Sequence, residues 1–373
     1  MPDRSVKRRM IFHIGFEKTG TTSLQNYFTN NDKFLRRNSI LYPKRNIGFQ
    51  NNNHRTLVAS YLPRNAEDFF LRPGSFNKAR VIGSLMREIE ESREDTILIS
   101  AEHFSSRFRQ PQILELASDF TAFNCKIMIF VREHLSRFYS SFATQVASGG
   151  QLVLEEYADQ VLSPENIYVR YADTITLGEQ VFGKNKIDVY LYSDTRNVLE
   201  DFFDALLSNG SSLPDPGLYS DKKSLGPNLT EALRLANVVI AGSARPSTYV
   251  EWLQQCYVQD RVRKWLERTA GGRPDGHWWL DDHRLEMLNA IAQADRSWLE
   301  DRYGVPLESR IQISRQPSLH ARSEEPAILL ARALVGTVRE RLILPNNMGW
   351  ILPVLLSMGH RLRALRTKLK LWN

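Results

Sequence analysis

Short, nearly continuous apolar runs alternate with segments of helical periodicity over about the first 210 residues of the chain. Such runs predict buried strands, because a strand covered on both faces leaves few positions for charged side chains. The predicted strands are 10–14, 96–100, 126–131 and 187–192, and helices are predicted after them at 21–30, 112–123, 135–146 and 196–207. This alternation predicts an α/β fold that is P-loop-like and three-layered, with a central, mostly parallel sheet flanked by helices.

The pattern changes beyond about residue 210, where helices are predicted at 230–238, 250–267 and 283–303 between loop-like stretches. We predict one domain over 8–310, with a nucleotide-binding core over about 8–240. A linker is predicted at 318–326, followed by a distinct tail at 327–373.

The tail is predicted to be a basic, amphipathic helical extension. Its apolar residues recur at steps of four and three, which places them on one helical face, and its Lys and Arg residues occupy the other faces. The apolar residues are Met358, Leu362, Leu365, Leu369 and Trp372. Such a helix packs on the body of the protein, packs on a second subunit as a homo-oligomer contact, or lies on an anionic membrane. The sequence leaves these three alternatives open.

Composition narrows the class of protein. A net charge of +7 fits an anionic ligand, a membrane surface or nucleic acid, and it fits a solvated surface equally well. Nucleic acid is not a predicted partner, because no zinc-finger or RNA-binding signature occurs. Two cysteines, Cys125 and Cys256, are too few for a disulfide framework or a cysteine-built metal site. The sequence contains no signal-peptide pattern and no apolar run near the ~18 residues that span a bilayer, so we expect a cytoplasmic location, with a peripheral contact at the inner membrane face left open.

The most informative segment is GFEKTGTTS at 15–23, between the first predicted strand and the first predicted helix. Its G-x-x-x-x-G spacing matches the nucleotide P-loop, which has Lys and then Ser or Thr directly after the second glycine. Here Thr21 and Thr22 occupy those two positions, and the lysine is Lys18, two residues before Gly20. The start of the helix still offers amides and hydroxyls to one phosphate group. The shifted Lys18 suits a donor whose 5'-phosphate is retained while its outer group leaves.

A second anion anchor is predicted at the end of the third strand. Arg132 follows this strand, at the carboxyl edge of the sheet where open α/β folds bind ligands. Ser136 and Ser140 share one face of the following helix. We predict that Arg132 and Ser140 converge on a second phosphate, for which the planar guanidinium is well suited.

These two motifs, EKTGTTSLQ at 17–25 and VREHLSRFYSSF at 131–142, resemble those of the sulfotransferases that use 3'-phosphoadenosine 5'-phosphosulfate (PAPS). The likeness is greatest to bacterial members that modify sugars or other small hydroxyl compounds. In that family the first motif binds the 5'-phosphosulfate, and the second binds the 3'-phosphate through an arginine and a serine eight residues later. The family usually has proline two residues after the arginine, where this chain has His134.

The resemblance implies an enzyme of the PAPS-dependent sulfotransferase type, with PAP as the product and no metal requirement. It implies that Tyr192 lies against the adenine and that 223–237 helps to close the nucleotide site. The residues predicted to bind the nucleotide are Lys18, Thr19, Gly20, Thr21, Thr22, Ser23, Arg132, Ser140 and Tyr192. The expected acceptor is a carbohydrate or glycoconjugate, with residues 44–80 forming part of its binding wall.

The acceptor hydroxyl loses a proton as it attacks sulfur, so a general base is expected, and Lys18 is predicted to stabilise the leaving phosphate. Glu102, after the second predicted strand, is the first candidate base. His103 is the second, and because side chains on a strand alternate, only one of these two is expected to face the sulfur. His54 is the third and is predicted to touch the acceptor. His13, inside the first strand, is expected to be a core residue.

Two other functions remain open at this point. The first is a P-loop-type kinase, which the displaced lysine and the lack of a clear Mg²⁺-holding aspartate at a strand end disfavour. The second is a catalytically inactive, sulfotransferase-like binding protein, since intact motifs do not by themselves establish turnover.

Overall fold

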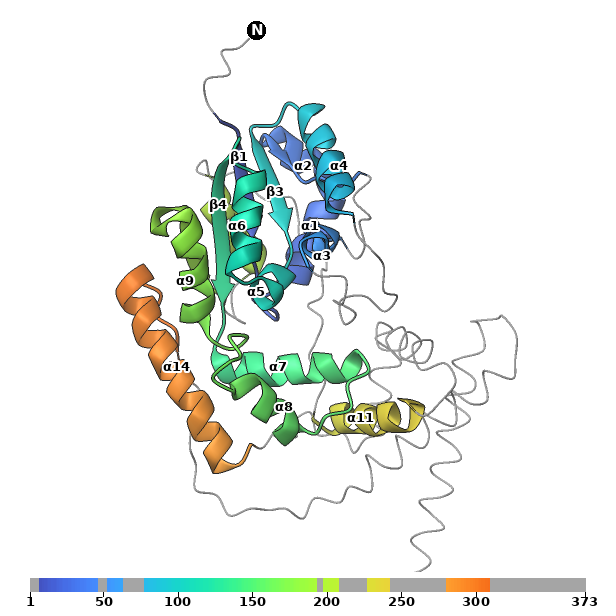
Figure 1. Ribbon diagram of the computed structural model, residues 1–373, viewed down its shortest axis with the longest axis vertical. Helices are drawn as coiled ribbons and strands as arrows, with labels where there is room; N and C mark the ends of the chain where they lie inside the picture. Colours follow the sequence, from blue (N-terminus) through green and yellow to red (C-terminus); the bar gives the residue numbers. More distant parts are fainter. Residues whose placement is uncertain are drawn as a thin grey trace, which may run out of the picture. The chain divides into compact units, whose positions relative to one another are not determined.

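The computed structural model describes residues 7–45, 52–62, 77–192, 197–207, 227–241 and 280–308 (Figure 1). The chain divides into two compact units. The first unit consists of Met1–Phe138, Ala158–Lys223 and Asp282–Ile313, and the second of Tyr139–Tyr157, Ser224–Asp281 and Ser314–Asn373. The predicted helix 250–267, the linker 318–326 and the tail 327–373 lie outside the described residues.

A parallel sheet of five described strands forms the centre of the first unit (Figure 1). Its spatial order is β2-β3-β1-β4-β5, and every pair of neighbours is parallel. The strands are β1 (Arg9–His13), β2 (Ile40–Leu41), β3 (Thr96–Ser100), β4 (Asn124–Val131) and β5 (Ile187–Leu191). The predicted fold class and the four predicted strands are confirmed, with ends shifted by up to two residues. The two-residue strand β2 was too short to predict.

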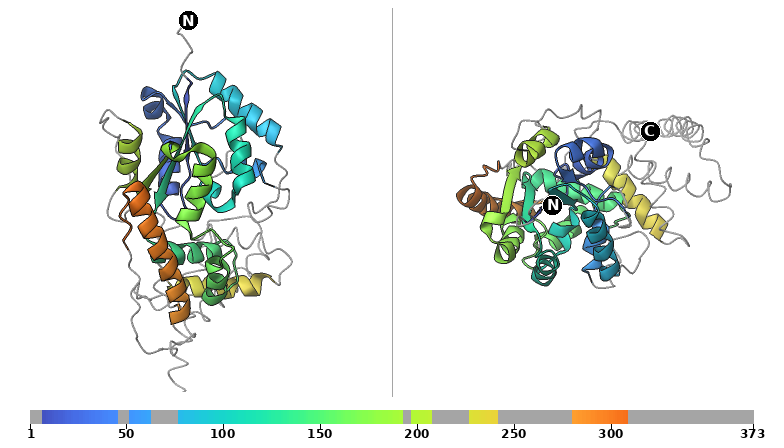
Figure 2. Two further views of the ribbon diagram at one scale, coloured as in Figure 1. Left: turned by 60° about the vertical axis from the view of Figure 1, so that its left-hand side comes forward. Right: turned by 90° about the horizontal axis from the view of Figure 1, so that it is seen from above.

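Both faces of the sheet are buried, which explains why its strands are almost continuously apolar. Along β1, Met10 and Phe12 point into one core cluster and Ile11 points into the other. Two helix layers cover these faces (Figure 2). One layer contains α1 (Thr21–Asn30), α2 (Asp32–Arg37) and α10 (Val198–Leu206). The other contains α3 (Arg55–Ser60), α4 (Lys78–Glu90), α5 (His103–Arg107), α6 (Gln110–Asp119), α9 (Tyr171–Phe182) and α14 (Asp282–Tyr303).

A buried carboxylate joins helix α14 to other elements of the first unit. Asp295 accepts hydrogen bonds from the amides of Tyr171 (2.8 Å) and Ala172 (2.9 Å) at the start of α9. It also pairs with Nε2 of His134 at 2.8 Å. A carboxylate at a helix N-terminus satisfies amides that have no acceptor within the helix and complements the helix dipole. Asp295 therefore joins three segments that are remote in sequence.

The second unit is described for three helical segments. Helix α7 (His134–Ala147) begins in the first unit and ends in the second. Helix α8 (Leu154–Leu162) begins in the second unit and ends in the first. Helix α11 (Pro227–Ala241) contributes Asn237, whose amide donates to the carbonyls of Val146 (2.7 Å) and Gly150 (2.9 Å). These bonds hold α11 against the last turn of α7, at Val146, and against the loop that follows α7, at Gly150. Among the described residues, no helix combines the length and apolarity needed to cross a bilayer.

Two histidines are buried behind the carboxyl end of the sheet. His13 shares a hydrogen bond of 2.9 Å with the hydroxyl of Ser100, and burial lowers its pKa to about 3. The prediction that His13 is a core residue agrees with its complete burial. His54 accepts from the amide of Ser100 through Nδ1 (3.1 Å) and donates through Nε2 to the carbonyl of Pro43 (2.9 Å). Burial lowers the pKa of His54 to about 4 and outweighs the opposing effect of its backbone bonds.

These two histidines predict a loss of stability in weak acid. Below the ordinary histidine pKa of 6.5, the unfolded chain takes up a proton at each site and the folded chain does not. The contribution of these two neutral histidines to stability is therefore fully present above pH 6.5 and is lost as the pH falls towards 4. Each histidine lowers the free energy of unfolding by about 1.4 kcal/mol per pH unit in that range. Urea unfolding between pH 7.5 and 5 measures this slope, and His54→Gln should make it shallower; an unchanged free energy of unfolding across that range contradicts the assignment.

Candidate functional site

The loop between β1 and α1 contains two residues in the left-handed region. Lys18 and Gly20 both have φ of 74°, and between them the buried Thr19 donates its hydroxyl to the carbonyl of Phe16 at 2.6 Å. The left-handed region is unfavourable for a residue with a Cβ atom, by about 1–2 kcal/mol. Lys18 adopts it nonetheless, so neighbouring groups must hold this conformation. The loop thus has a defined shape that the glycine spacing alone did not predict.

Glycine is required at two positions of this loop by close packing. A Cβ atom at Gly20 would lie 2.9 Å from Cε2 of Tyr192 and 3.0 Å from Cγ1 of Val198. At Gly15 it would lie 2.0 Å from Cγ2 of Thr21. The loop therefore lies directly against the residue that follows β5 and against the start of α10.

The first turn of α1 presents donors and has no acidic residue. Its first described intrahelical bond runs from the amide of Leu24 to the carbonyl of Gly20 at 3.2 Å. The amides of Thr21 to Ser23 therefore have no acceptor within the helix, and the helix dipole adds a partial positive charge there. Thr22 and Ser23 are partly exposed at this end of the helix. This arrangement is suited to bind an anionic group.

The Thr21 hydroxyl has a different partner from the one that the sequence suggested. It donates to Oε2 of Glu102 at 2.5 Å, and not to the phosphate group that the sequence analysis expected it to bind. Burial lowers the pKa of the half-buried Arg55 guanidinium, and the charge of Glu102 partly offsets this lowering. Glu102 therefore lies beside the start of α1, where a base for the predicted chemistry is needed.

The expectation that Glu102 and His103 point to opposite faces of a strand does not apply. Strand β3 ends at Ser100, and α5 begins at His103, so both residues lie on a turn where strand alternation has stopped. Glu102 faces Thr21, and His103 is near enough to the loop for its charge to lower the pKa of Glu17. Both candidate bases remain next to the loop.

Arg132 reaches the loop directly from the end of β4. Its Nη1 donates to the carbonyl of Lys18 at 3.1 Å, and its guanidinium lies 5.3 Å from the ring centre of Tyr192. The amide of Tyr192 donates to the carbonyl of Val131 at 2.8 Å, which continues the pairing of β5 with β4. Four predicted nucleotide-binding residues therefore come together: Lys18, Gly20, Arg132 and Tyr192.

Two other predicted site residues are placed differently. Ser140 lies on α7 beyond Phe138, where the first unit ends, so its convergence with Arg132 stays a prediction. His54 is fully buried, and both of its ring nitrogens are bonded to backbone groups. Its contacts are those of a structural residue that joins the segment before α3 to β3, and they give no support to the predicted role in acceptor binding, which stays untested.

The turn before α7 also differs from the expected one. His134 occupies the position where the family resembled has proline, and it forms the buried pair with Asp295. The carboxylate of Glu133 accepts from the amides of Leu135 (2.9 Å) and Ser136 (2.8 Å), so the start of α7 is capped by the chain itself. Sequence reasoning did not single out Glu133, because the helix was predicted to begin at 135 and glutamate is not among the usual N-cap residues.

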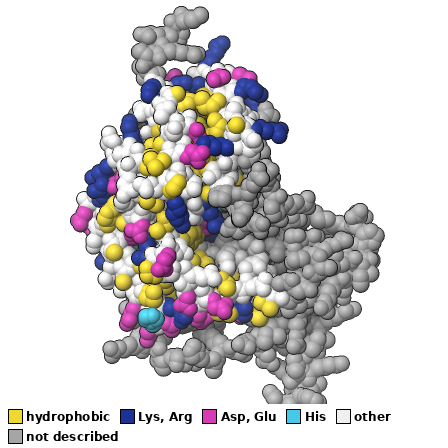
Figure 3. All heavy atoms as spheres, viewed as in Figure 1, with side chains coloured by type: hydrophobic (Ala, Val, Ile, Leu, Met, Phe, Trp, Pro, Cys, Tyr) yellow, Lys and Arg dark blue, Asp and Glu magenta, His cyan; other side chains and the backbone are white. Residues whose placement is uncertain are grey.

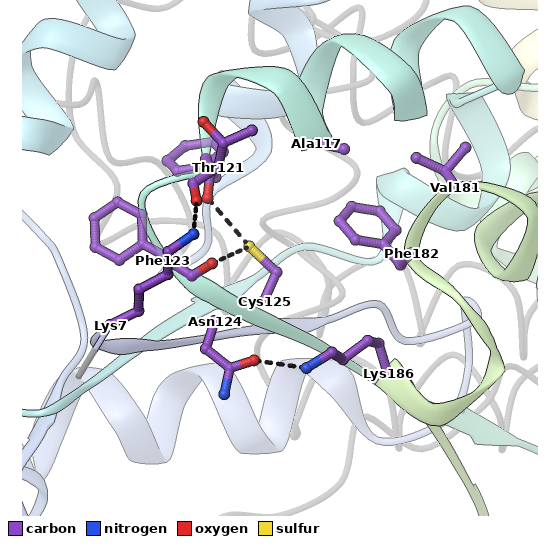
Figure 4. Close-up of a pocket in the computed structure, with 10 residues that line it drawn as sticks. Lys7, Ala117, Thr121, Phe123, Asn124, Cys125, Val181, Phe182 and Lys186 are labelled. Carbon is purple, nitrogen blue, oxygen red and sulfur yellow. Dashed lines mark hydrogen bonds between the residues drawn. The ribbon is translucent and has the colours of Figure 1, made fainter. Parts of the chain in front are cut away.

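A separate hollow of about 720 Å³ lies at the opposite end of the sheet, near the start of β4 (Figure 4). Lys7, Cys125 and Lys186 line it, and none of the predicted site residues does. Burial raises the pKa of the Cys125 thiol to about 11, despite the opposing charges of Lys186 and Lys7. The thiol is therefore protonated at neutral pH and is a poor nucleophile. Parallel α/β sheets bind ligands at the carboxyl ends of their strands, so this hollow is not the candidate site.

No protein-family model matches the chain, and no curated protein matches it. Among solved structures, the chain is similar to a sulfotransferase from Alicyclobacillus acidocaldarius, with 16% identity and a TM-score of 0.39. That similarity covers 81% of this chain and 98% of the other.

The packing of Gly20 predicts the effect of adding one methyl group. Gly20→Ala combines a positive φ with contacts of 2.9 and 3.0 Å to Tyr192 and Val198, and should lower the free energy of unfolding by about 1–3 kcal/mol. Gly83→Ala in α4 is the matched control, because its Cβ would meet no atom within 4 Å. Alanine is the better helix former there and should stabilise the protein by about 1 kcal/mol. Urea unfolding distinguishes the variants, and a Gly20→Ala protein as stable as the wild type would rule out the close packing.

Proposed function

We propose that the protein is a sulfotransferase that transfers the sulfuryl group of PAPS to a hydroxyl group of an acceptor, of the carbohydrate or glycoconjugate class. The observation that carries the proposal is the hydrogen bond from Arg132 to the carbonyl of Lys18. It joins the two cationic residues that the sequence assigns to separate phosphates of one nucleotide. Two such anchors, fixed to each other, favour a ligand with two separate anionic groups.

The groups at this edge of the sheet fit PAPS by their chemistry. Lys18 and Arg132 supply positive charge, and the start of α1 supplies amides together with the hydroxyls of Thr22 and Ser23. Planar guanidinium and helix-terminal amides are the groups that proteins use to hold phosphates. Tyr192 offers an aromatic ring beside Arg132 for the adenine. When bound, PAPS supplies the sulfuryl group and leaves as PAP.

Each residue then has a task in the transfer. The acceptor oxygen forms a bond to sulfur while the bond from sulfur to the 5'-phosphate oxygen breaks, and the hydroxyl proton passes to a base. Glu102 is the proposed base, because its carboxylate already lies at the start of α1 through its bond to Thr21. Lys18 stabilises the negative charge that develops on the leaving phosphate. His103, on the same turn, is the second candidate.

A P-loop-type kinase remains the sharpest competitor, and one observation favours it. A carboxylate that follows the strand beside β1 and lies next to the start of α1 is also where P-loop enzymes place the aspartate that holds Mg²⁺. Against it, the P-loop lysine that reaches the terminal phosphates is replaced by Thr21. The displaced Lys18 favours the sulfuryl donor.

The function is tested by offering both donors to the same protein. The purified protein is incubated with cell extract and PAPS in EDTA, and separately with labelled ATP and Mg²⁺, with Lys18→Ala as the control in each arm. We expect sulfated products by mass spectrometry in the PAPS arm, and their loss by orders of magnitude in the Lys18→Ala control. Phosphorylated products that depend on Lys18, with no sulfated ones, would establish a kinase instead. No product in either arm, with PAP bound, would indicate an inactive binding protein.

The identity of the base is tested with the acceptor found in that experiment. Glu102→Gln keeps the size and the bond to Thr21 but cannot take a proton, so turnover should fall about 100-fold or more. Its affinity for PAP should stay near that of the wild type. His103→Gln is the matched control and should retain turnover within a few-fold. Near-normal turnover of Glu102→Gln would remove Glu102 from this role, and a loss confined to His103→Gln would transfer it to the histidine.

A further inference from the structure

Arg137, five residues after Arg132, is a buried cation that the proposed reaction does not use. Its side chain lies in the first unit at the start of α7, and only 1% of its surface is exposed. A guanidinium stays charged at any ordinary pH, and removing it from water without compensation costs several kcal/mol. Its surroundings must therefore offset that penalty.

Three aromatic rings surround the guanidinium. The centres of the Phe16, Tyr168 and Tyr171 rings lie 4.9, 4.7 and 5.1 Å from its central carbon. One of its nitrogens also donates to the carbonyl of Tyr168 at 2.7 Å. Cation–π contacts of this kind are favourable when the cation is desolvated, and they fix ring positions as well as the charge.

The first tyrosine connects this cage to the loop after β1. The hydroxyl of Tyr168 donates to Oε2 of Glu17 at 2.7 Å. Burial raises the pKa of Glu17, but the Tyr168 bond and the charges of His103, Lys18 and Arg137 together hold it below its ordinary value. Glu17 is thus a fixed carboxylate directly before Lys18, the residue held in the left-handed region.

The second tyrosine connects the cage to the anchor after β4. The hydroxyl of Tyr171 donates to the carbonyl of Arg132 at 2.6 Å and accepts from its amide at 3.3 Å. The rings of Phe16 and Tyr171 contact each other with centres 4.6 Å apart. One guanidinium therefore lies against both tyrosines whose hydroxyls hold the two anchor segments.

We propose that Arg137 is a positioning residue for the nucleotide donor. It orients Tyr168, which holds the loop for the 5'-phosphate, and Tyr171, which holds Arg132 for the 3'-phosphate. This inference rests on the proposed function and deepens it. Each phosphate of the nucleotide depends on one tyrosine hydroxyl: the 5'-phosphate on that of Tyr168 and the 3'-phosphate on that of Tyr171. It follows that the two ends can be weakened one at a time.

The test is isothermal titration of the full chain with three probes: adenosine 3',5'-bisphosphate, adenosine 5'-phosphate and adenosine 3'-phosphate. Tyr168→Phe keeps the ring on Arg137 but releases Glu17, and should weaken the bisphosphate and the 5'-phosphate about tenfold while leaving the 3'-phosphate unchanged. Tyr171→Phe should weaken the bisphosphate and the 3'-phosphate and spare the 5'-phosphate. Arg137→Lys keeps the charge but loses the planar stacking, and should weaken all three probes.

Tyr303→Phe is the matched control, since it removes a hydroxyl–carboxylate bond of 2.6 Å to Glu179 between α14 and α9. It should leave all three affinities unchanged. Tyr168→Phe and Tyr171→Phe proteins that fold and bind every probe like the wild type would overturn the proposal. So would an equal loss for all probes in both variants, which is the mark of general destabilisation. A wild-type protein that binds none of the probes would refute the proposed function, and this inference with it.

Discussion

The candidate site depends on the left-handed conformation of Lys18. This conformation is unfavourable for a residue with a Cβ atom, and three neighbouring contacts accompany it. Arg132 bonds to the carbonyl of Lys18, Thr19 bonds back to Phe16, and Glu17 is held by Tyr168. The lysine of this loop precedes the second glycine, instead of following it as in the P-loop of nucleotide hydrolases. The displaced lysine is therefore also the residue whose backbone is left-handed.

The sheet order explains how residues far apart in sequence reach that loop. Strand β1 lies between β3 and β4, with His13 opposite Ser100 on one side and Met128 on the other. Because all three strands are parallel, their carboxyl ends meet at one edge. Glu102 and Arg132 leave the sheet there, on either side of the loop. Strand β5 adds Tyr192 next to Arg132 through the continued pairing with β4.

The sequence predicted the parts of this site that depend on local pattern. A charged residue directly after a long apolar run, such as Arg132, marks the end of a buried strand. The loop was visible from its glycine spacing. The sequence did not predict contacts that depend on how distant segments pack, such as Glu102 with Thr21 or Tyr168 with Glu17. The burial of His54 and its bonds to backbone groups were not visible in the sequence for the same reason, because they depend on which segments cover it.

The proposed recognition of an anionic nucleotide depends on these local donors more than on the net charge of the chain. On the described surface seen in Figure 3, Lys and Arg side chains are scattered and form no single patch. The site itself also contains the carboxylates Glu17 and Glu102. A site that contains both signs of charge attracts anions less strongly in general. The carboxylates, however, help to fix the orientation of each cation and its neighbours. Discrimination between a nucleotide with two separate phosphates and one with a single phosphate requires this fixed geometry, because a diffuse positive potential attracts both.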